Sequence, residues 1–293
     1  MTVLIIGASG NIGRNVVSEL VKRDVEVVAL VRKSEHGVTA DGPLSDPQVR
    51  IAEGDLTQPD TIRKAADGCT SIFVLTPHSP DQVELQNTAV DAASDVGAKI
   101  VKVSSWGPSV YKDSPVPGGY RHWLTQQYVI EQQVPYTFLQ PNYFMQVLIN
   151  RYANDVRRRG VLPSPAGSRG ISMVDVRDVA EVAACTLIEP GHDGRSYVLS
   201  GPTAPTYDQI ALMLTRLTGR DVTYHDLSED EFARWMKDEG RQPWETDHAA
   251  AIFRLYRTGI GELVTDDVER VTGRPPRTIE DFLTEHRSYF MPE

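Results

Sequence analysis

The sequence contains few cysteines and no long apolar segment. Its 293 residues include only two cysteines, Cys69 and Cys185, which are far apart and belong to no Cys-x-x-Cys or Cys/His pattern. This predicts neither a disulfide framework nor a metal site. No apolar run approaches the ~18 residues that span a bilayer, and the opening segment MTVLIIGASG lacks the regions of a signal peptide. We therefore expect a cytoplasmic protein with no membrane partner.

An excess of positive charge is also missing. The chain carries 30 Lys and Arg against 40 Asp and Glu, which gives a net charge of −10. Proteins that bind nucleic acids need a basic field to displace counterions from phosphates, so direct nucleic-acid binding is not expected. Hydrophobic residues make up 40% of the chain, which is typical of a globular protein and excludes a disordered or collagen-like one.

Apolar runs alternate with segments of helical periodicity as far as Pro141. Continuous apolar runs are typical of strands that are buried on both faces of a parallel sheet. The alternation predicts βαβ units with right-handed crossovers, and hence a doubly wound α/β domain of the Rossmann type. The expected strands lie at about residues 3–6, 25–31, 49–52, 71–75, 100–103 and 136–139.

The pattern changes after residue 141. We expect residues 142–159 to form one helix, and residues 171–201 to supply a short strand, a helix and a last strand that complete the sheet. Residues 1–141 would then form the cofactor domain. The remaining segments, 142–170 and 202–293, would form a smaller, helix-rich substrate lobe.

A glycine-rich turn, GASGNIG, joins the first expected strand to the first helix. Gly7 permits a tight turn, Gly10 lets the backbone approach a pyrophosphate, and Gly13 lets the helix pack on the strand. The helix N-terminus supplies free N–H groups and a partial positive charge. The turn predicts a dinucleotide site, with a purely structural turn as the alternative. The other loop residues expected at the cofactor are Ser9, Asn11 and Ile12.

The second expected strand ends without an acidic residue. NAD binders usually place an acid there for the ribose 2′-hydroxyl, whereas this chain has Arg32 and Lys33. Two cations suit the 2′-phosphate of NADP(H), although they could also be ordinary surface residues. Asp55 and Leu56 follow the third strand and are expected at the adenine edge, unless Asp55 only forms a turn.

Ligands of open parallel sheets lie beyond the carboxyl ends of the strands. That rule predicts where the nicotinamide and a small-molecule substrate would bind. Aromatic residues at these ends could stack on a flat acceptor, with plain core packing as the alternative. The further cofactor candidates are Thr76, Pro77, Ser104, Ser105, Asn142 and Tyr143, and the substrate candidates are His78, Trp106, His122 and Phe144.

Several stretches together resemble the NmrA-like atypical short-chain dehydrogenases. They include GASGNIG, VRK, GDL, QPDTIRKAADG, PYTFLQPNYFM and MVDVRDVAEVAA. Within that family, TPHSPDQ and HWLTQQYVIEQQVPYTFL are similar to the triphenylmethane reductase and type 2 quinone oxidoreductase group. The resemblance implies NADP(H) binding. It implies the substrate only weakly, because the family contains both reductases and NADP-binding sensor proteins.

The Tyr-x-x-x-Lys pair of ordinary short-chain dehydrogenases is missing. Tyr120 is followed four residues later by Leu124, and we expect Lys102, inside the fifth strand, to be neutralised or snorkelling and not catalytic. His122 could donate a proton or a hydrogen bond to the substrate, unless it is a structural histidine. A chain without acid–base machinery favours hydride transfer to a conjugated acceptor such as a quinone, dye, imine or carbonyl compound.

Two other functions stay open. A non-catalytic NADP(H)-binding redox sensor would use the same cofactor site without a substrate pocket. A sugar epimerase is the weaker option, since that chemistry relies on the missing Tyr and Lys. The sequence also allows a homodimer and leaves the natural substrate open.

Overall fold

The fold is built on one parallel sheet of seven strands. The computed structural model describes residues 1–32 and 42–291, so Lys33 lies outside the described residues. The strand order is β3-β2-β1-β4-β5-β6-β8, and every neighbouring pair is parallel. This order confirms the doubly wound Rossmann-type prediction. The strands are β1 (Thr2–Ile6), β2 (Glu26–Val31), β3 (Val49–Glu53), β4 (Ser71–Val74), β5 (Lys99–Val103), β6 (Tyr136–Pro141) and β8 (Arg195–Leu199).

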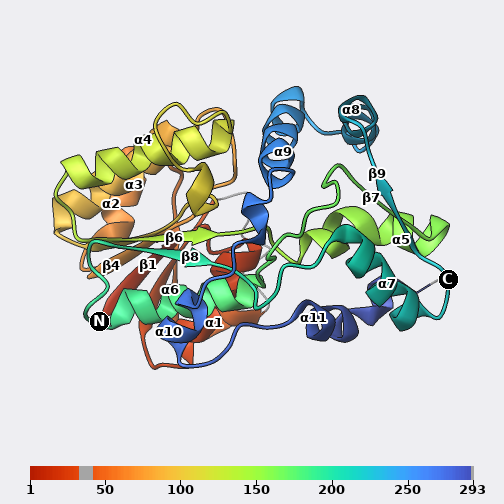
Figure 1. The fold of residues 1–293 in the computed structure, drawn as a ribbon. Helices are drawn as coiled ribbons and strands as arrows, with labels where there is room; N and C mark the ends of the chain where they lie inside the picture. Colours follow the sequence, from red (N-terminus) through yellow and green to blue (C-terminus); the bar gives the residue numbers. More distant parts are fainter. Residues whose placement is uncertain (33–41, 292–293) are drawn as a thin grey trace.

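Helices cover both faces of the sheet, as Figure 1 shows. Successive strand residues point to opposite faces, so Val3 and Ile5 belong to one buried cluster and Leu4 and Ile6 to another. The first cluster packs under α1 (Asn11–Val21) and α6 (Val176–Ile188). The second packs under α2 (Pro59–Ala66), α3 (Gln82–Val96) and α4 (Pro117–Glu131). Both faces are therefore dry, which explains the continuous apolar runs of the strands.

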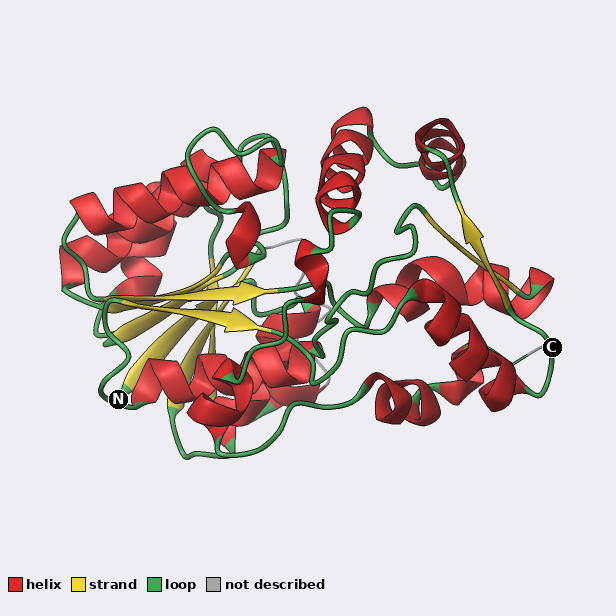
Figure 2. Cartoon of the chain, in the orientation of Figure 1, coloured by secondary structure: helices red, strands yellow, loops and turns green. Residues whose placement is uncertain are grey.

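A second lobe lies beyond the carboxyl ends of the strands, because the arrowheads of the sheet point toward it in Figure 2. It contains a third buried cluster, which is made largely by α5, α7, α8, α9 and α11. The lobe elements are the π-helix η4 (Leu148–Tyr152), α5 (Ala153–Arg159), β7 (Val161–Ser164), α7 (Tyr207–Thr218), β9 (Thr223–Asp226), α8 (Glu229–Asp238), α9 (Pro243–Tyr256) and α11 (Ile279–Glu285). The 3-10 turns are η2 (Gly42–Ser45), η3 (Gly107–Ser109), η5 (Ile260–Glu262) and η6 (Arg287–Tyr289).

Two expectations for the lobe are wrong. Residues 142–159 are not one helix, because the helical backbone begins at Leu148 and Phe144 instead forms an isolated parallel bridge with Val174. Only this bridge forms where a short strand was expected before α6. The segment after α5 forms the strand β7, which pairs with β9, and neither strand was expected. Both strands have only four residues, which is too short to produce a clear sequence pattern.

The C-terminal segment also returns to the sheet. α10 (Asp267–Thr272) packs against α6 and β8, and Val268 belongs to the buried cluster under the sheet. The Asp267 carboxylate accepts a hydrogen bond from the Val198 backbone N–H at 2.6 Å. Because β8 ends the sheet, this contact satisfies a backbone donor that an edge strand would otherwise leave open. The expected 202–293 lobe therefore includes a piece of the cofactor domain.

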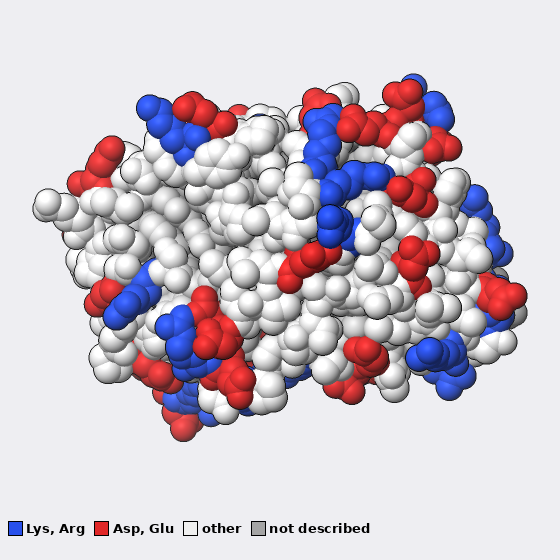
Figure 3. All heavy atoms as spheres, viewed as in Figure 1, with Lys and Arg blue, Asp and Glu red and all other residues white. Residues whose placement is uncertain are grey.

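In Figure 3, charged side chains of both signs lie side by side near the edges and in the right half of the face, and a broad area on the left and in the centre carries few of them. Among the described residues on this face, the basic groups form no wide surface of the kind that binds nucleic-acid backbones. Within residues 1–32 and 42–291, no helix combines the length and apolarity that crossing a membrane requires.

Candidate functional site

A groove of about 830 Å³ runs along the carboxyl edge of the sheet. Its walls come from the glycine-rich turn, the ends of β2 and β3, the loop after β4 and the segment after β6. This is the edge at which an open parallel sheet binds its ligand. Of the cofactor residues expected from the sequence, the groove is lined by Gly7, Ser9, Gly10, Asn11, Ile12, Arg32, Asp55, Leu56, Thr76 and Pro77, and Phe144 from the substrate set lines it too.

The three glycines of the turn serve different purposes. Gly7 has φ +86°, and a Cβ there would lie 2.5 Å from the Leu75 carbonyl oxygen. A Cβ at Gly13 would lie 2.0 Å from the Gly7 carbonyl oxygen, so Gly13 lets α1 pack on the turn and does not line the groove. A Cβ at Gly10 would meet only the Gly7 carbonyl oxygen, at 3.3 Å. The fold therefore requires Gly7 and Gly13, whereas Gly10 leaves space on the groove side.

The N-terminus of α1 opens into this groove. Gly10 is its N-cap and offers no side chain, and the first turn contains no acidic residue. The first N–H groups of a helix have no partner within the helix, and they carry a partial positive charge. Together with the space at Gly10, they form a cradle that fits a pyrophosphate.

Arg32 and Asp55 mark the other end of the groove. Asp55 Oδ1 accepts hydrogen bonds from the Thr57 backbone N–H at 2.9 Å and from the Thr57 hydroxyl at 2.7 Å. These bonds, with help from the positive charge of Arg32, lower the pKa of the Asp55 carboxyl. Asp55 is thus the turn-forming residue of the alternative interpretation, and it also lines the groove. Arg32 follows β2 at the position where NAD binders usually carry an acidic residue, and a cation at this position fits the 2′-phosphate of NADP(H).

Some expected cofactor residues do not line the groove. The Ser104 hydroxyl accepts a hydrogen bond from Gln126 Nε2 at 2.9 Å, and its neighbour Ser105 lies off the groove wall as well. Asn142 is buried and ties the end of β6 to the lobe. It donates to Ser172 Oγ at 2.8 Å and to the Gly261 carbonyl at 3.1 Å, and it accepts from the Tyr256 hydroxyl at 2.7 Å. Its bonds indicate a structural role, in contrast to the expected contact with the cofactor.

Two aromatic candidates are core residues. Trp106 is 2% exposed within the lobe cluster. Tyr143 packs edge-on against Phe253 and Tyr256 of α9, with ring centroids 5.6 and 6.0 Å apart. Its hydroxyl is buried without a hydrogen-bond partner among the described residues, and burial raises its pKa. The groove wall therefore receives Phe144 but neither Trp106 nor Tyr143.

His122 lies in a chain of side chains between α3, α4 and the sheet. Lys102 Nζ is 2.8 Å from His122 Nδ1, and Gln82 Nε2 is 2.8 Å from His122 Nε2. Gln82 Oε1 is 3.1 Å from His78 Nδ1, and Arg121 Nη1 is 3.3 Å from His78 Nε2. Both ring nitrogens of His122 are thus engaged inside the protein. This geometry argues against the expected role of His122 as a direct proton donor to a substrate.

The polarity of this chain follows from its donors and acceptors. Arg121 can only donate, so His78 Nε2 accepts and its Nδ1–H donates to Gln82 Oε1. Gln82 Nε2 then donates to His122 Nε2, which leaves the proton on Nδ1 facing Lys102 Nζ. Only a neutral amine can accept that bond. Burial lowers the pKa of Lys102 to about 7, in agreement with the neutralised lysine expected from the sequence.

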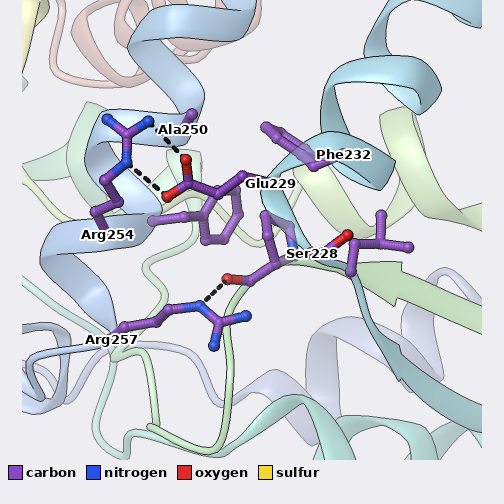
Figure 4. A pocket seen from close by; sticks show the side chains of 9 residues that line it. Ser228, Glu229, Phe232, Ala250, Arg254 and Arg257 are labelled. Carbon is purple, nitrogen blue, oxygen red and sulfur yellow. Dashed lines mark hydrogen bonds and ion pairs between the residues drawn. The ribbon is translucent and has the colours of Figure 1, made fainter.

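A second, smaller cavity of about 290 Å³ lies in the lobe between α8 and α9 (Figure 4). Phe232 contributes an apolar side chain to its lining. Its cations are already paired: Arg254 makes two bonds to the Glu229 carboxylate, at 2.7 and 2.9 Å. Arg257 donates to the Pro165 carbonyl at 2.9 Å and pairs with Asp226. Among the described lining residues, no cation of this cavity is left for a ligand.

Sequence reasoning missed several residues near the first groove. Gln82 is the first residue of α3 and follows His78 by four residues, so the two lie near each other at the start of this helix. Arg121, Arg151 and His248 carried no local signal, because they come from α4, η4 and α9, which meet only in the folded chain. Among the described residues, no group of His, Cys, Asp and Glu could hold a metal ion.

Comparison with known proteins gives one family and consistent neighbours. The sequence pattern of the NmrA-like family matches residues 1–283. An NAD(P)H azoreductase of Xenophilus azovorans is 34% identical over 290 residues, which cover 98% of this chain and 99% of that protein.

Two solved structures have the same fold. The NADPH-dependent quinone oxidoreductase of Escherichia coli, in complex with NADPH, superposes with a TM-score of 0.86 at 24% identity and covers 99% of both chains. The Citrobacter sp. triphenylmethane reductase, in complex with NADP(H), has a TM-score of 0.84 at 24% identity and covers 97% of this chain and 99% of that one.

Proposed function

The chain belongs to the NmrA-like family, and from this premise we propose that it is an NADPH-dependent oxidoreductase that transfers a hydride to a conjugated acceptor. Quinones, azo and triarylmethane dyes, imines and carbonyl compounds are the candidate acceptors. The observation that carries the proposal is the groove at the carboxyl edge of the sheet. It joins a glycine cradle and an open helix N-terminus to a cation at the end of β2. The named relatives, which are reductases of dyes and quinones, support the same reaction class.

Each part of the groove has a binding task in this proposal. The backbone of the glycine-rich turn and the first turn of α1 would hold the pyrophosphate. Arg32 would bind the 2′-phosphate, and Asp55 and Leu56 would border the adenine. Thr76 would border the nicotinamide end, where its hydroxyl is already fixed by a 2.9 Å bond from Gln86 Nε2. NADPH supplies the hydride when it is bound.

The chain's contribution to the reaction is mainly orientation. Phe144, from the segment after β6, and Pro77, from the loop after β4, both line the groove, so an acceptor bound there would pack against them. Proximity and orientation can supply most of the acceleration for an electron-poor acceptor, which takes a hydride without a proton in the same step. This suits a chain that lacks the Tyr-x-x-x-Lys pair.

A redox sensor without turnover would use the same groove, and activity separates the two functions. The test is an NADPH-oxidation screen over quinones, azo dyes, triarylmethane dyes, imines and enones. We expect steady turnover with at least one class and none with the Gly10→Val variant. Tight NADPH binding with no turnover on any acceptor would favour the sensor.

We also propose a cytoplasmic location and a homodimer. Both cysteines are buried and unpaired, which suits a reducing compartment. Light scattering of the purified chain would test the dimer, and a mass of one chain at micromolar concentration would contradict it.

A further inference from the structure

Arginine and histidine side chains gather beyond the nicotinamide end of the groove. His78 and His248 stack with ring centroids 3.9 Å apart, and Trp244 lies 5.5 Å from His78. Arg121 reaches His78 from α4. His78 sits between the lining residues Pro77 and Ser79, and Arg151 directly follows the lining residue Asn150, so both belong to segments of the groove wall without lining the groove themselves. We call Arg121, Arg151, His78 and His248 the basic cluster.

The two arginines of the basic cluster are not neutralised. Over residues 1–32 and 42–291, no carboxylate lies within ion-pair distance of either Arg121 or Arg151. The acid that acts on this region is Glu245, which is already engaged with Arg241 at 3.5 Å and with the Gln242 backbone N–H at 2.9 Å. Both arginines are half-buried. Unpaired cations that are partly removed from water are costly unless a ligand completes them.

The histidines do not add charge to this cluster. Burial and the neighbouring His78, Arg121 and Arg151 lower the pKa of His248 to about 3. Burial and Arg121 also lower the pKa of His78. Both rings are therefore neutral near pH 7 and can only give or take hydrogen bonds. Both arginines thus act electrostatically on the His248 ring.

The other face of α9 provides an internal comparison. There Arg254 is paired with Glu229 (Figure 4), and Arg257 is paired with Asp226. The arginines on the α8 side of this helix are thus held in ion pairs, whereas Arg121 and Arg151 make none with the carboxylates of the described residues. A cluster that served packing alone would have no reason for this difference.

We propose that the basic cluster is an acceptor subsite that binds an anionic group, a carboxylate, sulfonate or phosphate, on the molecule that receives the hydride. The proposal rests on the function proposed above and narrows its substrate class. Guanidinium groups bind such oxyanions in a bidentate manner. The neutral His248 ring accepts from the Gly118 backbone N–H at Nδ1, at 3.3 Å, and would donate its Nε2–H to the oxyanion. The same charges would disfavour a cationic dye.

The experiment compares a naphthoquinone sulfonate with the same naphthoquinone lacking the sulfonate, at saturating NADPH. We expect Arg121→Gln and Arg151→Gln each to lower kcat/KM for the sulfonate about tenfold, chiefly through KM. Both variants should keep kcat/KM for the parent quinone within about twofold, and raised salt should weaken the preference. Arg254→Gln, on the paired face of α9, is the matched control and should change neither value.

Two further measurements keep the test decisive. If Arg151→Gln is unstable in thermal unfolding, Arg151→Lys keeps the charge and should keep most of the preference. If neither quinone is reduced, the proposed reductase function is contradicted for these acceptors, and the subsite is tested by binding alone. Calorimetry of the sulfonate on the NADP⁺-loaded protein then decides. Sulfonate-dependent binding that is lost in Arg121→Gln supports the subsite. Binding that is equally strong with and without the sulfonate, or an equal effect of the variants on both quinones, overturns the proposed subsite.

Discussion

The two ends of the groove are built in different ways. The cofactor end is made by one short turn, its helix and the end of the neighbouring strand, and its ligand contacts come largely from the backbone. The proposed acceptor subsite beside the groove is made by side chains from four separate segments, at His78, Arg121, Arg151 and His248. Backbone geometry specifies a cofactor that many enzymes share, whereas side chains from distant segments specify the molecule that only this enzyme needs to distinguish.

The largest expected effect breaks the cofactor end alone. Gly10→Val should lower NADPH affinity at least a thousandfold, because the side chain would occupy the pyrophosphate cradle. The fold should survive, since a Cβ at Gly10 meets only one protein atom, at 3.3 Å. Calorimetry with NADPH, checked by thermal unfolding, measures both. Gly7→Val is the contrasting variant, and it should unfold because its Cβ would lie 2.5 Å from the Leu75 carbonyl. Wild-type affinity in Gly10→Val would locate the cofactor elsewhere.

The second prediction concerns the junction between the two ends. Asn142→Leu should lower the free energy of unfolding by about 3 kcal/mol, because it leaves the buried Tyr256 hydroxyl without its acceptor and removes the bonds to Ser172 and to the Gly261 carbonyl. Denaturant unfolding measures this change. Asn150, on the groove wall and exposed, is the control, and Asn150→Leu should cost less than ~0.5 kcal/mol. A small effect of Asn142→Leu would mean that the lobe is held to the sheet by other contacts.

The third prediction sharpens the cofactor end. Arg32→Ala should weaken NADPH binding about 10- to 100-fold, the value of one charge-assisted hydrogen bond, and should leave NADH almost unchanged. Direct titration of both cofactors checks it. Equal affinity of the unmodified protein for NADH and NADPH would contradict the assignment of a 2′-phosphate site at this strand end.

The same contrast explains what the sequence could predict. The doubly wound parallel sheet follows from local patterns of apolar runs, and this prediction is confirmed. The turn with three spaced glycines is equally visible in the sequence, and its role as a cofactor cradle stays a prediction. The roles of Asn142, Tyr143 and Trp106 depend on which residues pack against them. Both Asn142 and Tyr143 contact residues of α9. No local pattern reports such a partner. The same limit applies to Arg151, which reads as a surface cation until α9 is placed beside it.

The last prediction concerns the polar chain from Lys102 to His78, where the change in stability is spread over several pH units, and it tests whether Lys102 is neutral in the fold. The pKa of Lys102 falls from its ordinary value near 10.5 to about 7 in the folded chain. Between these two values the unfolded chain binds the extra proton, so stability should rise with pH across this window and stay at its lower level below pH 7. The slope from this group should approach about 1 kcal/mol per pH unit between roughly pH 7.5 and 9.5. Lys102→Met removes the titrating group and should flatten that part of the curve. Groups that titrate alike in the unmodified protein and in Lys102→Met cancel in the difference between the two curves. Denaturant unfolding at several pH values gives both curves, and parallel curves would mean that Lys102 stays charged inside the fold, which would reverse the donor and acceptor order as far as His78.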